Sequence, residues 1–209
     1  MWMAWTAVIL FVAIIAIGLG WRWASRNWTL PCPTLLAWAL EDPRFARISG
    51  TSTTLDRMEL RAGQRILEIG PGPGRLLVPA AKRILPDGEA VGIDIQPGMI
   101  DRLKARVQQA NIPNLSAILG DATQPHVPEA SFDLVFLCTV LGEVPDRAAV
   151  LAQAFRALKS GGMLSITEKF GDPHYQSRST VKRLAEAAGF RLRSLEGRWW
   201  FFTANFVKP

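Results

Sequence analysis

The feature that most constrains the fold of this chain is a short apolar run that breaks into alternating glycines, Ile66-Leu67-Glu68-Ile69-Gly70-Pro71-Gly72-Pro73-Gly74. The run predicts a buried parallel strand, and the apolar positions from Leu76 to Ile84 predict a helix directly after it. Glycines at such a turn let a ligand approach the backbone closely, and the helix N-terminus beyond supplies unpaired N–H groups. The sequence therefore predicts a cofactor-binding turn in a doubly wound α/β fold.

The spacing of these glycines and the acids around them indicates which kind of cofactor is bound. Dinucleotide sites usually have the pattern G-x-G-x-x-G, whereas this chain has G-x-G-x-G preceded by Glu68. A second predicted strand, 90–95, carries Asp94 near its end, where a carboxylate can accept both hydroxyls of a ribose. A third, 115–119, is followed by Asp121. Alternatively, Asp94 caps the next helix and Asp121 is only a turn residue.

These residues resemble the class I S-adenosylmethionine (SAM) methyltransferases, in a subset close to quinone, sterol and arsenite methyltransferases. Segments 131–137 and 158–166 resemble the fourth and fifth strands of that family, and the resemblance covers roughly residues 55–207. It implies SAM as cofactor and S-adenosyl-L-homocysteine as product, with no metal. The cofactor residues that it implies are Glu68, Gly70, Gly72, Gly74, Asp94, Ile95, Asp121, Ala122 and Cys138.

The family resemblance also implies a Rossmann-like sheet of seven strands in the order 3-2-1-4-5-7-6, with the last strand antiparallel. Between the strands, the sequence predicts helices near 97–110, 146–158 and 178–188, the last ending at Gly189. The tail, 190–207, is expected to form two strands joined at Glu196-Gly197. Residues 51–209 are assigned to this methyltransferase domain.

The N-terminal residues predict a membrane anchor over residues 1–28. Residues 1–20 carry no charge, and about 20 apolar residues in a helix span a bilayer. Tryptophans stand on both sides, as at membrane interfaces, and the first basic residues, Arg22 and Arg26, follow the span. This pattern predicts a single-pass protein of the cell membrane with its catalytic domain on the cytosolic side. A buried core helix is the alternative.

Residues 29–50 are expected to form an interfacial or lid segment. Pro31 and Pro33 end the anchor, and Thr34 is placed to cap a short amphipathic helix that stops near Pro43. Such a helix can lie among lipid headgroups, cover the active site, or simply pack on the domain.

Charge and cysteine content narrow the choice of partners. The net charge of +6 is spread over the chain without a basic stripe, which disfavours nucleic acid and suits contact with an anionic lipid bilayer. Two cysteines, Cys32 and Cys138, form no disulfide framework and are too few for arsenic chemistry. The oligomeric state is not determined by the sequence.

Three residues are candidates for contact with the methyl acceptor. Glu143 follows the fourth strand, although it also fits as a carboxylate at a helix entry. His174 and Tyr175 follow the fifth strand, and His174 is a candidate base because the imidazole side chain commonly serves as a general base near neutral pH. The alternative is that His174 and Tyr175 pack a lid, and His126 is expected at the surface.

These observations predict a membrane-anchored methyltransferase that acts on a lipophilic small molecule resembling a quinol or a phospholipid. Aromatic residues 199–202 suggest an apolar acceptor pocket, although most of them are expected to be core. Two alternatives remain: the same fold methylates a small soluble thiol, or the chain binds SAM without catalysis.

Overall fold

The computed structural model describes residues 37–209 and, before them, residues 5, 6, 9, 12, 13, 16, 20, 23 and 24, each in helical conformation. In this part of the chain, no helix has the length and apolar character needed to cross a bilayer. Apart from those isolated positions, the expected anchor over residues 1–28 lies outside the described residues, as do Cys32 and Thr34.

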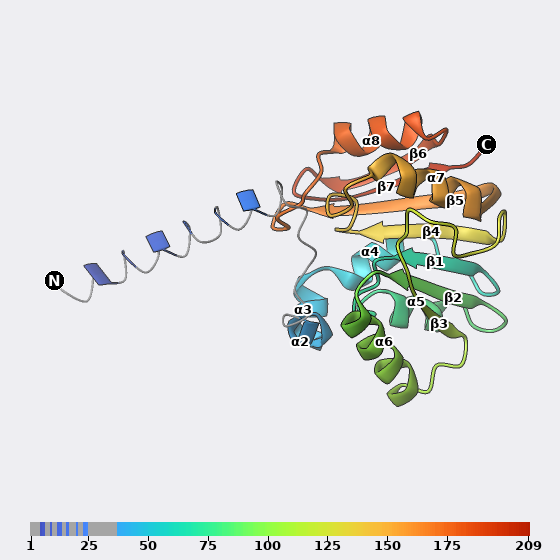
Figure 1. The fold of residues 1–209 in the computed structure, drawn as a ribbon, viewed down its shortest axis with the longest axis horizontal. Helices are drawn as coiled ribbons and strands as arrows, with labels where there is room; N and C mark the ends of the chain where they lie inside the picture. Colours follow the sequence, from blue (N-terminus) through green and yellow to red (C-terminus); the bar gives the residue numbers. More distant parts are fainter. Residues whose placement is uncertain are drawn as a thin grey trace.

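One sheet of seven strands runs through the domain in the order β3-β2-β1-β4-β5-β7-β6, as expected (Figure 1). Strand β7 pairs antiparallel with both of its neighbours, and the other pairings are parallel. The strands are β1 (Arg65–Ile69), β2 (Glu89–Asp94), β3 (Leu115–Leu119), β4 (Phe132–Cys138), β5 (Leu158–Lys169), β6 (Arg191–Arg198) and β7 (Phe201–Val207).

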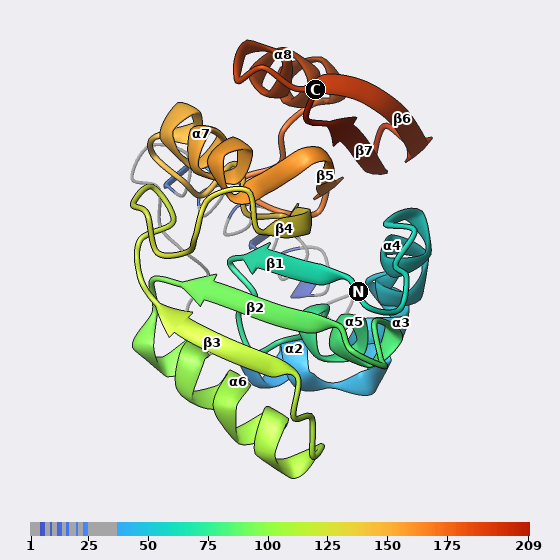
Figure 2. The same ribbon diagram turned by 90° about the vertical axis from the view of Figure 1, so that its right-hand side faces the viewer.

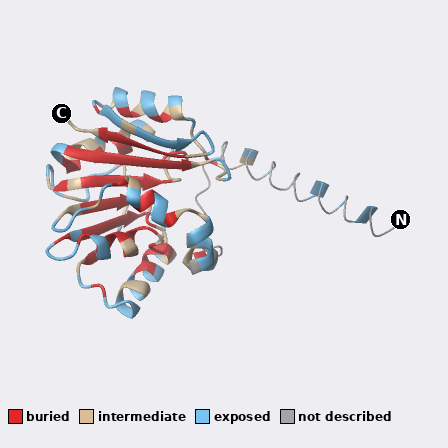
Figure 3. Cartoon of the chain, turned by 180° about the vertical axis from the view of Figure 1, so that it is seen from behind, coloured by how far each residue is buried: buried red, intermediate tan, exposed pale blue. Residues whose placement is uncertain are grey.

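Helices cover both faces of the sheet (Figure 2). They are α2 (Ala37–Glu41), α3 (Pro43–Ile48), α4 (Thr51–Arg57), α5 (Leu77–Arg83), α6 (Pro97–Gln109), α7 (Arg147–Ala157) and α8 (Arg178–Ala187). Because side chains alternate along a strand, Leu67 packs with α7 and α8 while Ile66 packs with α4 and α5. The strands are buried throughout the middle of the sheet, and the outer surfaces of the helices are exposed (Figure 3). Burial on both faces explains why the parallel strands have continuous apolar sequences.

The predicted helices near 97–110, 146–158 and 178–188 correspond to α6, α7 and α8. Helix α8 ends as its glycine predicts, because Gly189 has a φ of +95°. The N–H of Gly189 donates to the Glu186 carbonyl and the N–H of Phe190 to the Ala185 carbonyl, which is a Schellman motif.

The connection between the last two strands differs from the prediction. Gly197 lies within β6, opposite Phe202, and the turn is formed by Trp199 and Trp200 instead of Glu196 and Gly197. Gly197 has a positive φ, as in many turns, but here the glycine is needed for close packing. A Cβ at this position would lie 2.3 Å from the Phe201 carbonyl oxygen. As a result, both tryptophans lie at an exposed hairpin tip and not in a core strand.

The segment before the domain also differs from the single helix expected there. Helix α2 ends at Glu41, and Pro43 begins a second helix, α3, with Asp42 accepting the Arg44 N–H at 2.7 Å. Proline suits the first turn of a helix because the N–H that it lacks has no partner there. Glu41 pairs with Arg102 of α6 at 3.2 Å, which attaches α2 beside the carboxyl edge of the sheet.

Candidate functional site

A cavity of about 490 Å³ lies at the carboxyl ends of β1, β2 and β4, where doubly wound folds bind their ligands. All of the predicted cofactor residues except Gly74 line it. Gly74 instead allows close packing of the glycine turn on α6, because a Cβ there would lie 2.5 Å from Leu103 Cδ1. The ligand contacts of the lining residues remain predictions.

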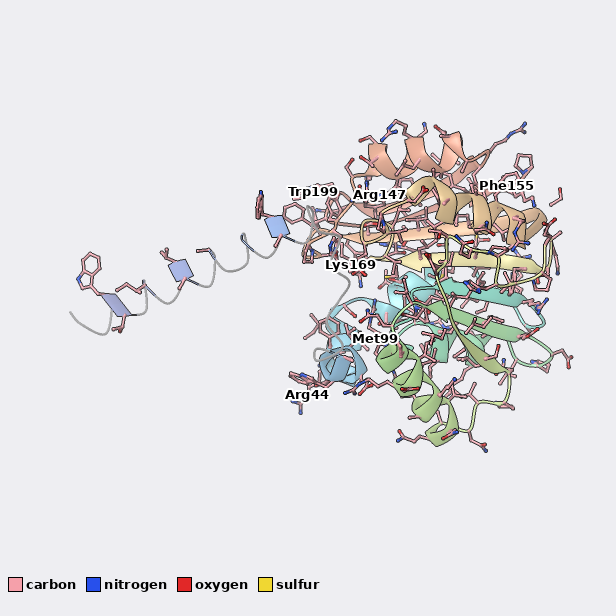
Figure 4. The ribbon with its side chains drawn as sticks, in the orientation of Figure 1. Arg44, Met99, Arg147, Phe155, Lys169 and Trp199 are labelled. Atoms are coloured by element: carbon pink, nitrogen blue, oxygen red, sulfur yellow. The ribbon has the colours of Figure 1, made fainter. Side chains whose placement is uncertain are left out.

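The glycine turn has the geometry that a nucleoside cofactor needs. Gly70 and Gly72 have positive φ values of 69° and 54°, which side chains rarely adopt. A Cβ on Gly70 would lie 2.6 Å from Val140 Cγ2, whereas a Cβ on Gly72 would meet no atom closer than Met99 Sδ at 4.0 Å. Met99 lies in the first turn of α6 (Figure 4). The backbone at Gly72 is therefore open to the cavity.

Asp94 is held in place by backbone donors. Its Oδ2 accepts the Gly72 N–H at 3.0 Å, and its Oδ1 accepts the Gln96 N–H at 2.9 Å. Burial raises the pKa of Asp94, and these hydrogen bonds counteract that rise. The carboxylate thus links the glycine turn to the start of α6, which fits both the ribose role and the alternative of a helix-entry residue.

Glu68 is a buried acid whose Oε2 has no hydrogen-bond partner in the described structure. Burial raises its pKa to about 8, and the positive charge of Arg75 partly offsets this effect. Because Glu68 lines the cavity, the orphaned oxygen suits a positively charged donor such as the ammonium group of SAM. The site therefore fits the cofactor.

Asp121 is exposed and lines the cavity beside Ala122. Its Oδ1 accepts the Thr123 N–H and hydroxyl, both at 2.9 Å, which is the turn arrangement considered as the alternative. Both hydrogen bonds of this turn use Oδ1 of Asp121. Because Asp121 also lines the cavity, its Oδ2 is compatible with a ligand contact. His126 is exposed, as predicted.

Glu143 lines the cavity, but His174 and Tyr175 do not. His174 is 4% exposed, and its Nδ1 lies 3.8 Å from Glu143 Oε1 and 3.9 Å from Asp172 Oδ1. A Cβ on Gly142 would lie 1.9 Å from the His174 carbonyl oxygen. The loop that follows β4 and the loop that follows β5 therefore pack backbone to backbone. His174 therefore lies beside Glu143 and Asp172 without lining the cavity itself, and its role toward the acceptor stays a prediction.

Tyr175 belongs to an aromatic cluster at the surface. Its ring lies against Phe170, with centroids 5.6 Å apart, and its hydroxyl donates to the Trp199 carbonyl. Desolvation raises the pKa of Tyr175, and the nearby Glu168 raises it further. These contacts fit the alternative of lid packing, and the predicted contact of Tyr175 with the acceptor stays a prediction.

Several lining residues were missed by the sequence analysis. Arg75, directly after the glycine turn, donates to Ser49 Oγ at 3.1 Å, to Thr51 Oγ1 at 3.0 Å and to Cys138 Sγ at 3.4 Å. Thr139 follows β4 with a φ of +59°, and Leu40 reaches the cavity from α2. Thr139 was recognisable as the first residue after a strand. Leu40 belongs to the segment 29–50 that was expected at the interface or as a lid, but its entry into the cavity depends on the packing of α2.

Glu168, near the end of β5, is another buried acid, and its raised pKa predicts how the stability of the fold depends on pH. Burial raises its pKa to about 8, the Gln176 N–H donates to its Oε2 at 3.1 Å, and its Oε1 has no hydrogen-bond partner in the described structure. A raised carboxyl pKa means that the folded state holds a proton that the unfolded chain releases at lower pH, so stability falls as pH rises toward about 8.

We therefore expect Glu168→Gln to be more stable than the wild type above pH 8, by about 1–3 kcal/mol, and to gain little near pH 5. Urea unfolding at both pH values measures this, with Glu196→Gln, an exposed carboxyl on β6, as the control. An equal effect of Glu168→Gln at both pH values would contradict the assigned burial cost.

The doubly wound sheet, the glycine turn and the acid at the end of β2 define a class of protein, the nucleoside-cofactor-binding α/β domain. Residues 66–162 match the family model described as a methyltransferase domain. The matched segment runs from β1 into β5, and the sheet around it has the fold of SAM-dependent methyltransferases.

Similar proteins and structures agree with this assignment. The chain is 36% identical over 113 residues to nocamycin O-methyltransferase of Saccharothrix syringae, covering 54% of this chain and 40% of that protein. It is 31% identical over 112 residues to demethylmenaquinone methyltransferase of Listeria monocytogenes, covering 54% and 47%. The chain thus spans about half the length of these curated relatives or less.

A crystal structure of a SAM-dependent methyltransferase from Aquifex aeolicus has a TM-score of 0.79, with 19% identity over 86% of this chain and all of that chain. Phosphoethanolamine N-methyltransferase 2 of Haemonchus contortus, in complex with SAM, has a TM-score of 0.66, with 18% identity over 77% of this chain and 52% of that one. At these identities the likeness shows the fold.

Proposed function

We propose that this protein transfers the methyl group of SAM to a lipophilic small-molecule acceptor, resembling a quinol or a phospholipid, at a membrane. The observation that carries the proposal is the composition of the cavity. It combines the cofactor acids with an apolar wall formed by Val140, Val144 and Pro145, which flank Glu143 in sequence, and by Leu40 of α2. The relative named demethylmenaquinone methyltransferase supports a quinone-like acceptor.

In this proposal the protein's main contribution is alignment. Bound SAM supplies an activated methyl group on a sulfonium. Asp94 and Glu68 orient the cofactor, and the apolar wall holds the acceptor and excludes water. Holding two reactants in line is worth about 7–11 kcal/mol of the barrier. Where the acceptor atom carries a proton, Glu143 accepts it, and His174, 3.8 Å away, steadies the carboxylate.

Membrane attachment remains part of the proposal, with residues 1–28 as anchor and residues 29–50 at the interface or over the site. The uncharged residues 1–20 support the anchor, and Leu40 in the cavity wall supports the lid. In this arrangement the domain lies on the cytosolic side of the cell membrane.

The test is incubation of native membranes containing the full chain with methyl-labelled SAM, followed by partition of the products between organic and aqueous phases. We expect label in the organic phase and its loss when residues 1–28 are deleted. The full-length Asp94→Ala variant, which lacks the cofactor acid, is the control that should label neither phase. Label only in the aqueous phase would contradict a lipophilic acceptor and favour a small thiol. No label despite intact SAM binding would favour a non-catalytic protein.

A further inference from the structure

Exposed aromatic and aliphatic side chains gather at the carboxyl edge of the sheet, outside the cavity. Ile48 at the end of α3 is 81% exposed, and at the β6–β7 hairpin tip Trp199 and Trp200 are 55% and 44% exposed. We call these residues, together with Phe170, the edge patch. Phe45 and Trp38, also exposed, extend it along α3 and α2.

The edge patch is a preformed surface. Phe170 and Trp199 pack edge to face with centroids 5.0 Å apart, as do Trp199 and Trp200 at 5.6 Å. The Phe170 N–H donates to the Trp200 carbonyl at 2.8 Å, which fixes the hairpin tip against the end of β5. Large apolar rings that are held rigidly in solvent, instead of folding back onto the core, indicate a binding surface.

Two contacts join the hairpin tip to α3. Lys169 donates its ammonium to the Ser49 carbonyl, one residue after Ile48, and lies 5.0 Å from the centre of the Phe201 ring. The Ser49–Gly50 turn packs on the same ring, since a Cβ on Gly50 would lie 2.8 Å from Phe201 Cε1. Ile48 and the two tryptophans therefore belong to one continuous edge.

Basic side chains surround this edge. Arg44 and Arg47 are exposed on α3, and the Arg198 guanidinium lies over the Trp200 ring at 5.2 Å. Trp199, Lys169 and Arg44 all lie on the same side of the domain (Figure 4). Tryptophan prefers the boundary between headgroups and acyl chains, and arginine is attracted to anionic headgroups.

We infer that the edge patch docks on the surface of an anionic lipid bilayer, with Trp199 and Trp200 at the level of the headgroups. A lipid surface is the occupant that fits both the aromatic tip and the surrounding arginines, and it agrees with the anchor proposed for the uncharged first 20 residues of the chain. Docked in this way, the carboxyl edge and the cavity that opens there face the bilayer. This inference rests on the membrane location proposed above, but not on the acceptor.

The test uses the full chain, labelled with 5-fluorotryptophan and reconstituted in nanodiscs of equal parts phosphatidylcholine and phosphatidylglycerol. Trp199→Phe and Trp200→Phe assign the two fluorine signals, and a lipid carrying a nitroxide near its headgroup reports contact. Leu192→Trp places a matched reporter on an exposed position at the opposite end of β6. We expect the Trp199 and Trp200 signals to be lost and the reporter signal at position 192 to persist.

Survival of the Trp199 and Trp200 signals, in a chain that floats with the lipid, would overturn the inference and leave the proposed anchor intact. A chain that does not float at all would instead refute the membrane location. In nanodiscs of phosphatidylcholine alone we expect both signals to recover, because the arginines then lose their anionic partner. Signals still lost under that condition would overturn the requirement for anionic lipid.

Discussion

Asp94→Ala is expected to weaken SAM binding by roughly 10²–10⁴-fold, because two hydrogen bonds from ribose hydroxyls to a charged carboxylate contribute about 3–6 kcal/mol. The same carboxylate accepts the N–H groups of Gly72 and Gln96, so its removal also loosens the glycine turn. Isothermal titration with SAM measures the change in Kd.

Two variants separate these effects of Asp94. Asp101→Ala removes an exposed acid of α6 and should leave the Kd unchanged. Asp94→Asn retains one oxygen acceptor and should fall between the wild type and Asp94→Ala. SAM affinity that stays at the wild-type level in a folded Asp94→Ala protein would disprove the assignment of this residue to the ribose and favour its role as a helix-entry residue.

Glu143→Gln is expected to lower kcat by about 10²–10⁴-fold, which is the usual contribution of a positioned general base, and to leave SAM affinity unchanged. The expectation applies to an acceptor atom that carries a proton, such as a phenol or thiol. Initial rates with labelled SAM in the membrane assay, combined with titration of SAM, separate kcat from cofactor binding.

His174→Ala should reduce kcat less than Glu143→Gln, because His174 does not line the cavity and acts through Glu143. A positioning role predicts that His174→Ala also changes the pH dependence of kcat. Glu129→Gln, an exposed acid in the loop before β4, is the matched control. If Glu143→Gln turns over at the wild-type rate, the acceptor needs no base and Glu143 is a helix-entry carboxylate.

The cofactor half of the site was predictable because its residues are local in sequence. In parallel strands the carboxyl ends meet at one edge, so Glu68, Asp94 and Asp121 had to converge once the strands were recognised. The glycines at 70 and 72 carry their own signal, since few other residues adopt a positive φ. Strand order followed from the family resemblance and agrees with the structure.

The acceptor half could not be read in the same way, because it depends on how loops pack on one another. His174 was expected to face the acceptor, but the close approach of its backbone to Gly142 buries it behind Glu143. Glu196 and Gly197 suggested a turn, whereas pairing with β7 places the turn three residues later, at Trp199 and Trp200. These outcomes depend on distances between segments that are far apart in sequence.

The sequence by itself determined the fold class and the edge of the sheet where the site lies, because strand periodicity and glycine geometry are local properties, and the expectation of SAM as cofactor came from the family resemblance. Only the tertiary structure decided that Arg75 and Leu40 enter the cavity and that Trp199 and Trp200 stand in solvent. Side-chain exposure depends on the neighbours that a fold brings together, and a local pattern does not contain them.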